Sequence, residues 1–347
     1  HNAVEAGPDW WLSNPNGSGP FRFFAYQPGF GLLLARNDSF YREPAYVEGV
    51  VFDLRGGSWL DRYAADVIDF QPSIFADDVD AVFDQNGPYW NDLVRDASGN
   101  PGVVQMSVNY VGFNAHQPPF DDPLVRQAFS RSVDKQLLNE TIFRNLSVVA
   151  EGILPPSMPG FNRSLRGLDF NPAQARQLLA QSRYAGKLPP VKITVAGVGG
   201  PVGGLVGGLV DQWQRNLGVT VEVEQVDWES FLADTRAGRT QMFQLGWSAD
   251  YPDPSDFLDV LFHSGSGENH TGYSNPEVDR LLEAARGERN VQTRLRLYQQ
   301  AEQIVVRDAA WLPLSFGRDY PLVKPWVHGL TFSGMDIPYL RFVWLDQ

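Results

Sequence analysis

Short apolar runs separated by turn residues fill the first third of the chain. The runs cover residues 21–26, 31–35 and 47–54, and the residues between them include Pro28-Gly29 and Asn37-Asp38-Ser39. Runs of this length that end at Gly, Pro, Asn or Asp are typical of strands joined by tight turns. The pattern therefore predicts an antiparallel meander in this part of the chain.

A further β-rich run covers residues 103–114 and leads into Gln117-Pro118-Pro119-Phe120. Proline lacks the backbone N–H that strand pairing needs, so the two prolines end the strand. We place a crossing between two lobes near Asn114. The expected division is a β-rich segment of the first lobe, a second lobe and a return to the first lobe, over residues 1–114, 115–316 and 317–347.

Helix starts are the clearest local signal beyond that point. An Asp or Asn side chain can cap exposed backbone N–H groups, and a proline at the first helical position has no N–H to leave unpaired. Four such pairs occur: Asp122-Pro123, Asn171-Pro172, Asp253-Pro254 and Asn275-Pro276. The sequence predicts a helix after each pair.

The helix after Asn275 also shows which of its faces is buried. Its apolar residues recur at i, i+3, i+4 and i+7: Val278, Leu281, Leu282 and Ala285. This spacing places them on one face, which we expect to belong to the core. Gly287 stands where a left-handed C-terminal cap is expected.

A βαβ unit is predicted between these helices. It consists of a strand over residues 191–197, a helix that ends near Asn216, and a strand over residues 219–226 in which valines alternate with polar residues. Such a unit implies parallel pairing through a right-handed crossover. Residues 293–307 predict another amphipathic helix and residues 312–316 a short strand.

Composition and charge exclude several classes of function. The 347 residues exceed the usual size of a single hydrophobic core, which favours two lobes. The formal net charge is -13 and no run of Lys or Arg occurs, so nucleic acid and anionic membranes are not expected partners. The chain has no cysteine, which excludes thiol catalysis, disulfides and iron–sulfur clusters. No apolar stretch in the sequence reaches membrane-spanning length.

The sequence contains no convincing pattern for a cofactor, a metal or catalysis. The glycine-rich segment 197–203 joins a strand to a helix, but Val202 replaces the third glycine of a dinucleotide-binding loop and Pro201 removes a backbone N–H. His263 and His270 flank a loop beside carboxylates, and we interpret them as surface residues rather than metal ligands. The sequence also has no nucleophile elbow. We expect no cofactor, no metal site and no enzymatic activity.

The candidate chemistry lies in the segment 246–258. Asp253 is explained as a helix cap, and Asp256 as an acid in the first helical turn, where the helix dipole favours negative charge. Asp250 has no comparable local role. It is therefore the carboxylate in this segment that needs another explanation.

Asp250 stands between Trp247 and Tyr251. A carboxylate among aromatic side chains is costly unless a cationic group pairs with it. One hypothesis is that Asp250 binds the ammonium group of a ligand while the two aromatic residues provide apolar and cation–π surface. The alternative is a turn aspartate bonded to its own backbone, and the segment alone leaves both open.

Five segments in this order resemble the family 5 extracellular solute-binding proteins, the dipeptide, oligopeptide and nickel group. They are Gly17-Ser18-Gly19-Pro20-Phe21 with residues 35–41, Gly112-Phe113-Asn114 with residues 118–129, Leu154-Pro155-Pro156-Ser157-Met158-Pro159-Gly160, the stretch 247–258, and residues 322–329. The resemblance implies a two-lobed periplasmic-binding-protein-like α/β fold with mixed sheets and helices. It also implies the solute-binding component of an ABC importer, which captures short peptides between its lobes and delivers them to a membrane permease.

The resemblance also implies roles for particular residues. Trp247 and Asp250 match positions that face the bound peptide, with the carboxylate pairing with the N-terminal amine. Asn114 and Tyr251 are further candidates for ligand binding. Gln244 stands where some oligopeptide binders place a cationic residue for the other end of the peptide. The resemblance therefore does not imply that the terminal carboxylate of a peptide is recognised in this way here.

Further expectations follow from the family. The protein is expected to be a monomer that lies in the periplasm or outside the cell, where it is anchored as a lipoprotein or secreted. Because the segment that begins at Gly17 lies well inside typical members, we expect the N-terminal part of lobe one and a small extra domain to be missing from this chain. Two alternatives stay open: a binder of an oligosaccharide or metal chelate on the same scaffold, and a ligand-sensing domain of a regulatory protein.

Overall fold

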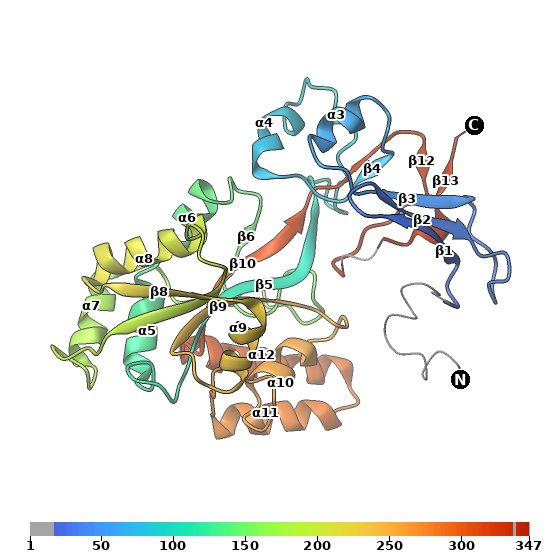
Figure 1. The fold of residues 1–347 in the computed structure, drawn as a ribbon. Coiled ribbons are helices and arrows are strands. Elements are labelled where there is room, and N and C mark those ends of the chain that lie inside the picture. Colours follow the sequence, from blue (N-terminus) through green and yellow to red (C-terminus); the bar gives the residue numbers. More distant parts are fainter. Residues whose placement is uncertain (1–16, 336–337, 347) are drawn as a thin grey trace. The chain divides into compact units, whose positions relative to one another are not determined.

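The computed structural model describes residues 17–335 and 338–346, and the chain forms two compact units (Figure 1). Unit 1 contains the described residues up to Val103 and from Asp319 onward. Unit 2 contains residues 104–318. Each unit is therefore described by itself.

The first boundary between the units falls after Val103, the first residue of strand β5 (Val103–Phe113), whereas the sequence pattern placed a crossing near Asn114. Strand β5 pairs antiparallel with β9 (Met242–Ser248) in the central sheet of unit 2. The prolines at positions 118 and 119 follow the end of this strand, but they do not separate the units. A strand belongs to the sheet that satisfies its hydrogen bonds, and the local sequence of β5 does not reveal its partner.

The predicted antiparallel meander is present in unit 1. Strands β1 (Phe21–Gln27), β2 (Gly31–Arg36) and β3 (Gly49–Asp53) pair in this order, each antiparallel to the next. Gly29 in the first turn has a φ of 69°, in the left-handed region that glycine adopts without a steric penalty. The turn residues thus define the hairpin as expected.

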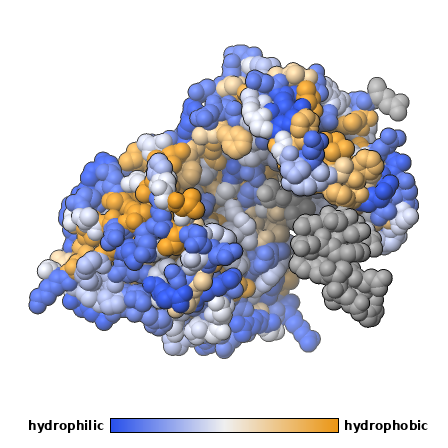
Figure 2. Space-filling model, in the orientation of Figure 1, coloured by the Kyte–Doolittle hydropathy of each residue, from blue (hydrophilic) through white to orange (hydrophobic). Residues whose placement is uncertain are grey.

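The tail of the chain completes unit 1 by strand pairing. Strand β11 pairs antiparallel with β4, and β12 pairs antiparallel with β13. The remaining elements of the unit are α3 (Trp59–Ala64), β4 (Phe70–Gln71), η1 (Ala76–Asp78), α4 (Val79–Val82), β11 (Leu322–Val323), β12 (Val327–His328), η2 (Leu340–Phe342) and β13 (Trp344–Leu345). Figure 2 shows hydrophobic residues gathered over the small sheet, where Phe24, Phe30 and Val51 are exposed.

A mixed six-stranded sheet forms the centre of unit 2, with the strand order β6-β10-β5-β9-β7-β8 (Figure 1). Strands β7 and β8 are parallel, as the predicted βαβ unit requires, and β7 is also parallel to β9. The strands not yet delimited are β6 (Val148–Val149), β7 (Val191–Ala196), β8 (Val221–Val226) and β10 (Trp311–Asp319). Helix α8 (Gly204–Leu217) connects the two parallel strands.

Two separate hydrophobic cores cover the two faces of this sheet. Val108 and Tyr110 of β5 pack in the core with helices α10, α11 and α12, whereas Val111 and Phe113 pack in the core with α5 and α8. Successive side chains of a strand point to opposite faces, which explains this division. Side chains on both sides of β5 are therefore buried toward its C-terminal end, whereas the edge strand β8 exposes Glu222.

Side chains cap the helices where the Asp-Pro and Asn-Pro pairs predicted them. Asp122 accepts a hydrogen bond from the N–H of Leu124, and Asn171 and Asn275 cap their helices in the same way. The helices of unit 2 are α5 (Pro123–Arg131), α6 (Lys135–Thr141), α7 (Pro172–Gln181), α8, α9 (Trp228–Arg236), α10 (Ser255–Phe262), α11 (Pro276–Gly287) and α12 (Val291–Arg307).

The expected left-handed cap at Gly287 is wrong. Gly287 is the last residue of α11, it has no left-handed φ, and the chain leaves the helix through Glu288 in an extended conformation. The Glu288 carboxylate accepts a hydrogen bond from the N–H of Asn290, which caps α12. The extended exit therefore connects directly to the start of the next helix.

Candidate functional site

The candidate site lies in the connection between strand β9 and helix α10 of unit 2. Trp247 is in β9, opposite Val108 of β5, and its partly buried side chain packs against the core formed with α10 to α12. Asp250 and Tyr251 follow in the connection itself. The central sheet therefore positions Trp247, and the connection positions the two residues after it.

Buried Asp256 fixes this connection from the first turn of α10. One of its oxygens, Oδ2, accepts hydrogen bonds from the indole N–H of Trp247 and from the backbone N–H of Asp250, both at 3.1 Å. Asp256 is only 1% exposed, and this burial raises the pKa of its carboxyl group, although the two hydrogen bonds act in the opposite direction. The sequence analysis assigned Asp256 only to the helix dipole and missed this role, which depends on a tertiary contact.

Asp253 lies just before α10, whose N-cap position is Pro254 and not Asp253 as the sequence predicted. Its Oδ1 accepts hydrogen bonds from the backbone N–H of Ser255 at 3.0 Å and from the Ser255 hydroxyl at 2.8 Å. Its Oδ2 forms an ion pair with Arg294 of α12 at 2.8 Å. Burial opposes ionisation of Asp253, but the hydrogen bonds from Arg294 and Ser255 outweigh it and lower the pKa of the carboxyl group. Two of the three acids in this segment are thus occupied by the protein.

The carboxylate of Asp250 has no hydrogen-bond or ion-pair partner among residues 17–335 and 338–346. Only its backbone N–H is used, in the bond to Asp256. The side chain is exposed, so water solvates it in this unliganded chain and the expected cost of a carboxylate enclosed by aromatic residues does not arise. The alternative of a turn aspartate bonded through its side chain to its own backbone also has no support from the contacts.

Tyr251 contributes an exposed aromatic ring beside Asp250. It is 43% exposed, and its hydroxyl lies 3.3 Å from the Ser255 hydroxyl, which donates to Asp253. Gln244 lies on β9, and its side-chain amide donates to the neighbouring carbonyl of Leu245 at 3.5 Å. The structure therefore brings Trp247, Asp250 and Tyr251 together in one segment.

Asn114 does not join this group. It lies beside the start of β9, because its N–H donates to the carbonyl of Gln241, while Trp247 lies near the other end of that strand. Six residues of an extended strand separate these ends by roughly 20 Å.

The amide of Asn114 is also fully used by the protein. It donates to the carbonyls of Gly238 and Thr240 at 3.0 and 2.8 Å, and it accepts from the N–H of His116 at 3.0 Å. Asn114 is 2% exposed. We therefore propose a structural role for Asn114 in place of ligand contact, because all its hydrogen-bonding groups have partners inside the protein.

A buried arginine anchors one of the segments that carry the family resemblance. Arg126 in α5 donates to the carbonyls of Phe120, Asp308 and Ala309. These carbonyls belong to the loop before α5 and to the end of α12. The guanidinium group thus holds together chain segments that are distant in sequence.

A buried glutamate anchors a second segment. Glu302 of α12 accepts hydrogen bonds through Oε1 from the N–H groups of Ile153 and Leu154, at 2.8 and 2.9 Å. Its other oxygen is buried and has no hydrogen-bond partner in the described part of the chain. Burial raises the pKa of this carboxyl group to about 7, although the two N–H donors act to lower it. Sequence alone could not identify either anchor, because a charged residue in an amphipathic helix usually faces solvent.

The two histidines that were interpreted as surface residues are in fact largely buried. The side chain of His270 is 7% exposed and lies 3.1 Å from Glu268, and that of His263 is 16% exposed and lies 3.4 Å from Glu283. Burial lowers the pKa of His270.

Within residues 17–335 and 338–346, no group of three or more potential metal ligands occurs. In the same residues, no helix has both the length and the apolar character needed to cross a membrane.

Comparison with known proteins gives consistent matches along the chain. A family model described as bacterial extracellular solute-binding proteins, family 5 Middle, matches residues 1–269. Heme-binding protein A of Haemophilus influenzae is 25% identical over 336 residues, which cover 94% of this chain and 59% of the relative. Dipeptide-binding protein DppE of Bacillus subtilis is 25% identical over an alignment of 356 residues, and the match covers 98% of this chain and 62% of the relative. The chain thus spans less than two thirds of the length of either relative.

The solved structures show the same fold. The murein tripeptide binding protein MppA of Escherichia coli aligns with 99% of this chain and 68% of its own, with a TM-score of 0.79 and 22% sequence identity. At this identity the likeness shows the fold alone. The chain therefore has the α/β fold of the periplasmic peptide-binding proteins, with mixed sheets and helices, as the sequence predicted.

Proposed function

Because the chain belongs to the family 5 bacterial extracellular solute-binding proteins, we propose that it captures short peptides for an ABC importer and delivers them to the membrane permease. We also propose that it acts outside the cytoplasmic membrane, as a monomer and without catalysis. The relatives named above are binding proteins, which supports a function in binding. The observation that carries the proposal is the unpaired carboxylate of Asp250 beside two aromatic residues.

The geometry of the segment suits a ligand with a positive group. Asp256 holds the backbone of Asp250 and the ring of Trp247, so two groups of the proposed site are fixed before a ligand arrives. Fixing a site in advance reduces the entropy that is lost on binding. The carboxylate of Asp250 is exposed and has no partner within the described part of the chain, so an ammonium group would not have to displace one there. The ring of Tyr251 offers additional apolar and cation–π surface.

The proposed contact can be tested by changing the carboxylate and the amine together. Calorimetry would compare a dipeptide with its N-acetylated form, on the unchanged protein and on Asp250→Asn. If the carboxylate pairs with the amine, acetylation weakens binding to the unchanged protein by at least tenfold, since loss of one partner of a close charge pair costs about 2–5 kcal/mol. Acetylation changes the affinity of Asp250→Asn by about twofold at most, because the partner of the amine is already absent.

A matched control separates local pairing from a general effect of charge. Glu222 on β8 is also exposed, so Glu222→Gln removes the same charge elsewhere on unit 2. This variant should bind the dipeptide as the unchanged protein does. Equal losses on acetylation for the unchanged protein and Asp250→Asn would refute the amine contact, and no dipeptide binding to the unchanged protein would refute the peptide function.

A metal chelate is a second candidate ligand. The relative named heme-binding protein A favours it, because heme is an iron chelate with a large aromatic surface and two carboxylates. Exposed Tyr251 and partly buried Trp247 could stack on such a surface. A thermal-shift comparison of hemin with di- and tripeptides would separate the candidates, because a ligand that binds the folded state raises Tm, and at equal concentration the tighter ligand raises it more.

A further inference from the structure

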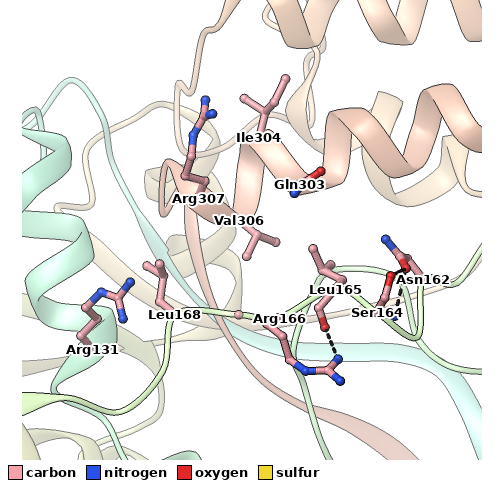
Figure 3. Close-up of a pocket in the computed structure, with 11 residues that line it drawn as sticks. Arg131, Asn162, Ser164, Leu165, Arg166, Leu168, Gln303, Ile304, Val306 and Arg307 are labelled. Carbon is pink, nitrogen blue, oxygen red and sulfur yellow. Dashed lines mark hydrogen bonds between the residues drawn. The ribbon is translucent and has the colours of Figure 1, made fainter.

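A cavity of about 680 Å³ lies in unit 2 between helix α12 and the loop that precedes α7. None of the residues proposed to bind the peptide lines it. The residues that line it are Arg131, Asn162, Ser164, Leu165, Arg166, Gly167, Leu168, Gln303, Ile304, Val306 and Arg307. Figure 3 shows Leu165 and Leu168 of the loop facing Val306 of the helix across the gap, with Arg131 beside Leu168.

The charge of this cavity is opposite to that of the chain. The protein carries a formal net charge of -13, yet the lining includes three arginines and no acidic residue. Arg131 ends α5 and Arg307 ends α12, where the helix dipole favours positive charge. Arg166 lies in the loop and has no such explanation.

The arginines also keep free hydrogen-bond donors. Arg131 donates through Nη1 to the carbonyl of Asp169 at 3.4 Å, and Arg166 donates through Nη1 to the carbonyls of Arg163 and Leu165, both at 2.9 Å. Neither has a carboxylate within ion-pair distance in the described residues, whereas Arg307 pairs through Nε with Asp308 at 3.3 Å. In the same residues, the Nη2 group of each of the three arginines has no hydrogen-bond partner, although a guanidinium group carries five N–H donors.

We propose that this cavity is a binding site for a small organic anion with an apolar body. The guanidinium group of Arg131, which lies beside Leu168 in Figure 3, would bind a phosphate or carboxylate head, for which a guanidinium group can provide two parallel hydrogen bonds. Leu165, Leu168 and Val306 would contact the apolar body. The volume lies within the range of small-molecule sites, about 300–1,000 Å³. This site is distinct from the peptide site and does not depend on it.

Calorimetric titration of the purified protein tests the proposal with three probes that share a ring. Phenyl phosphate and benzoate carry the two kinds of anionic head, and benzyl alcohol is neutral. At one ionic strength, we expect at least one of the anions to bind at least fivefold more tightly than the alcohol. Arg131→Gln should weaken the binding of that anion at least fivefold, and Arg131→Lys should lose less affinity than Arg131→Gln because it keeps the charge without the planar fork.

Two control variants separate this site from its alternatives. Arg289→Gln removes an exposed arginine outside the cavity and should change anion affinity less than twofold. Asp250→Asn should leave anion affinity unchanged, because the peptide site is separate. Binding of neither anion above the level of benzyl alcohol would overturn the proposal. So would an equal loss in Arg289→Gln and Arg131→Gln, since it would mean that the arginines act only through diffuse charge.

Discussion

Asp256 allows a sharp test of how the candidate site is built. Its Oδ2 is the shared acceptor for the indole N–H of Trp247 and the backbone N–H of Asp250. Replacing Asp256 with alanine removes this acceptor and leaves both donors without a partner. Because Asp256 is 1% exposed, little water is available in its place.

The expected loss of stability follows from these two bonds. A buried donor left unpaired costs about 1–3 kcal/mol, so Asp256→Ala should lower the free energy of unfolding by about 2–4 kcal/mol, allowing for the partial exposure of Trp247. Asp256→Asn is the matched comparison, because its amide oxygen can still accept both bonds. Burial already disfavours the charged form of this carboxyl group, so the neutral amide should cost less than about 1.5 kcal/mol.

Urea denaturation followed by tryptophan fluorescence measures the loss of stability, and calorimetry with a dipeptide measures the consequence for the site. We expect Asp256→Ala to weaken dipeptide binding, because Trp247 and Asp250 are no longer held in place, whereas Asp256→Asn binds nearly as the unchanged protein does. A loss of stability below about 0.5 kcal/mol in Asp256→Ala would refute the reasoning. An equal loss of affinity in the two variants would show that the charge of Asp256, and not its role as an acceptor, matters for binding.

Two further predictions concern buried polar groups. The pKa of Glu302 is about 7 in the folded chain against an ordinary value of 4.5, so the folded state holds the proton longer and the free energy of unfolding should fall as pH rises from about 4.5 to 7. Urea unfolding at pH 5 and pH 8 should show this fall, by up to about 3 kcal/mol, and should show a much smaller one in Glu302→Gln; identical profiles would contradict the pKa. Asn114→Ala should lower stability by about 2–3 kcal/mol because it breaks three buried hydrogen bonds, and it should leave dipeptide affinity unchanged. Weaker dipeptide binding in a stably folded Asn114→Ala would instead restore Asn114 to the ligand site.

Local signals in the sequence predicted most of the secondary structure. Capping by Asp122, Asn171 and Asn275 acts over two or three residues, so the helix starts could be read without knowledge of the rest of the chain. The parallel pairing of β7 and β8 followed for a similar reason, because a helix between two strands brings the second back in the same direction. Gly287 was misinterpreted because a cap also depends on where the chain must go next.

The sequence by itself determined the elements, the family and the candidate segment around Asp250, because caps, turns and alternation act over a few residues and the family segments occur in a fixed order. Tertiary structure decided which polar side chains are occupied. Asn114 and Asp256 are used inside the protein by partners from other elements, whereas the carboxylate of Asp250 has no hydrogen-bond or ion-pair partner among the residues that the structure describes. Tertiary structure also brought together the arginine-lined cavity from α5, a loop and α12. The physical reason is that hydrogen bonds and burial depend on which distant segments meet, and a local pattern of residues does not contain that information.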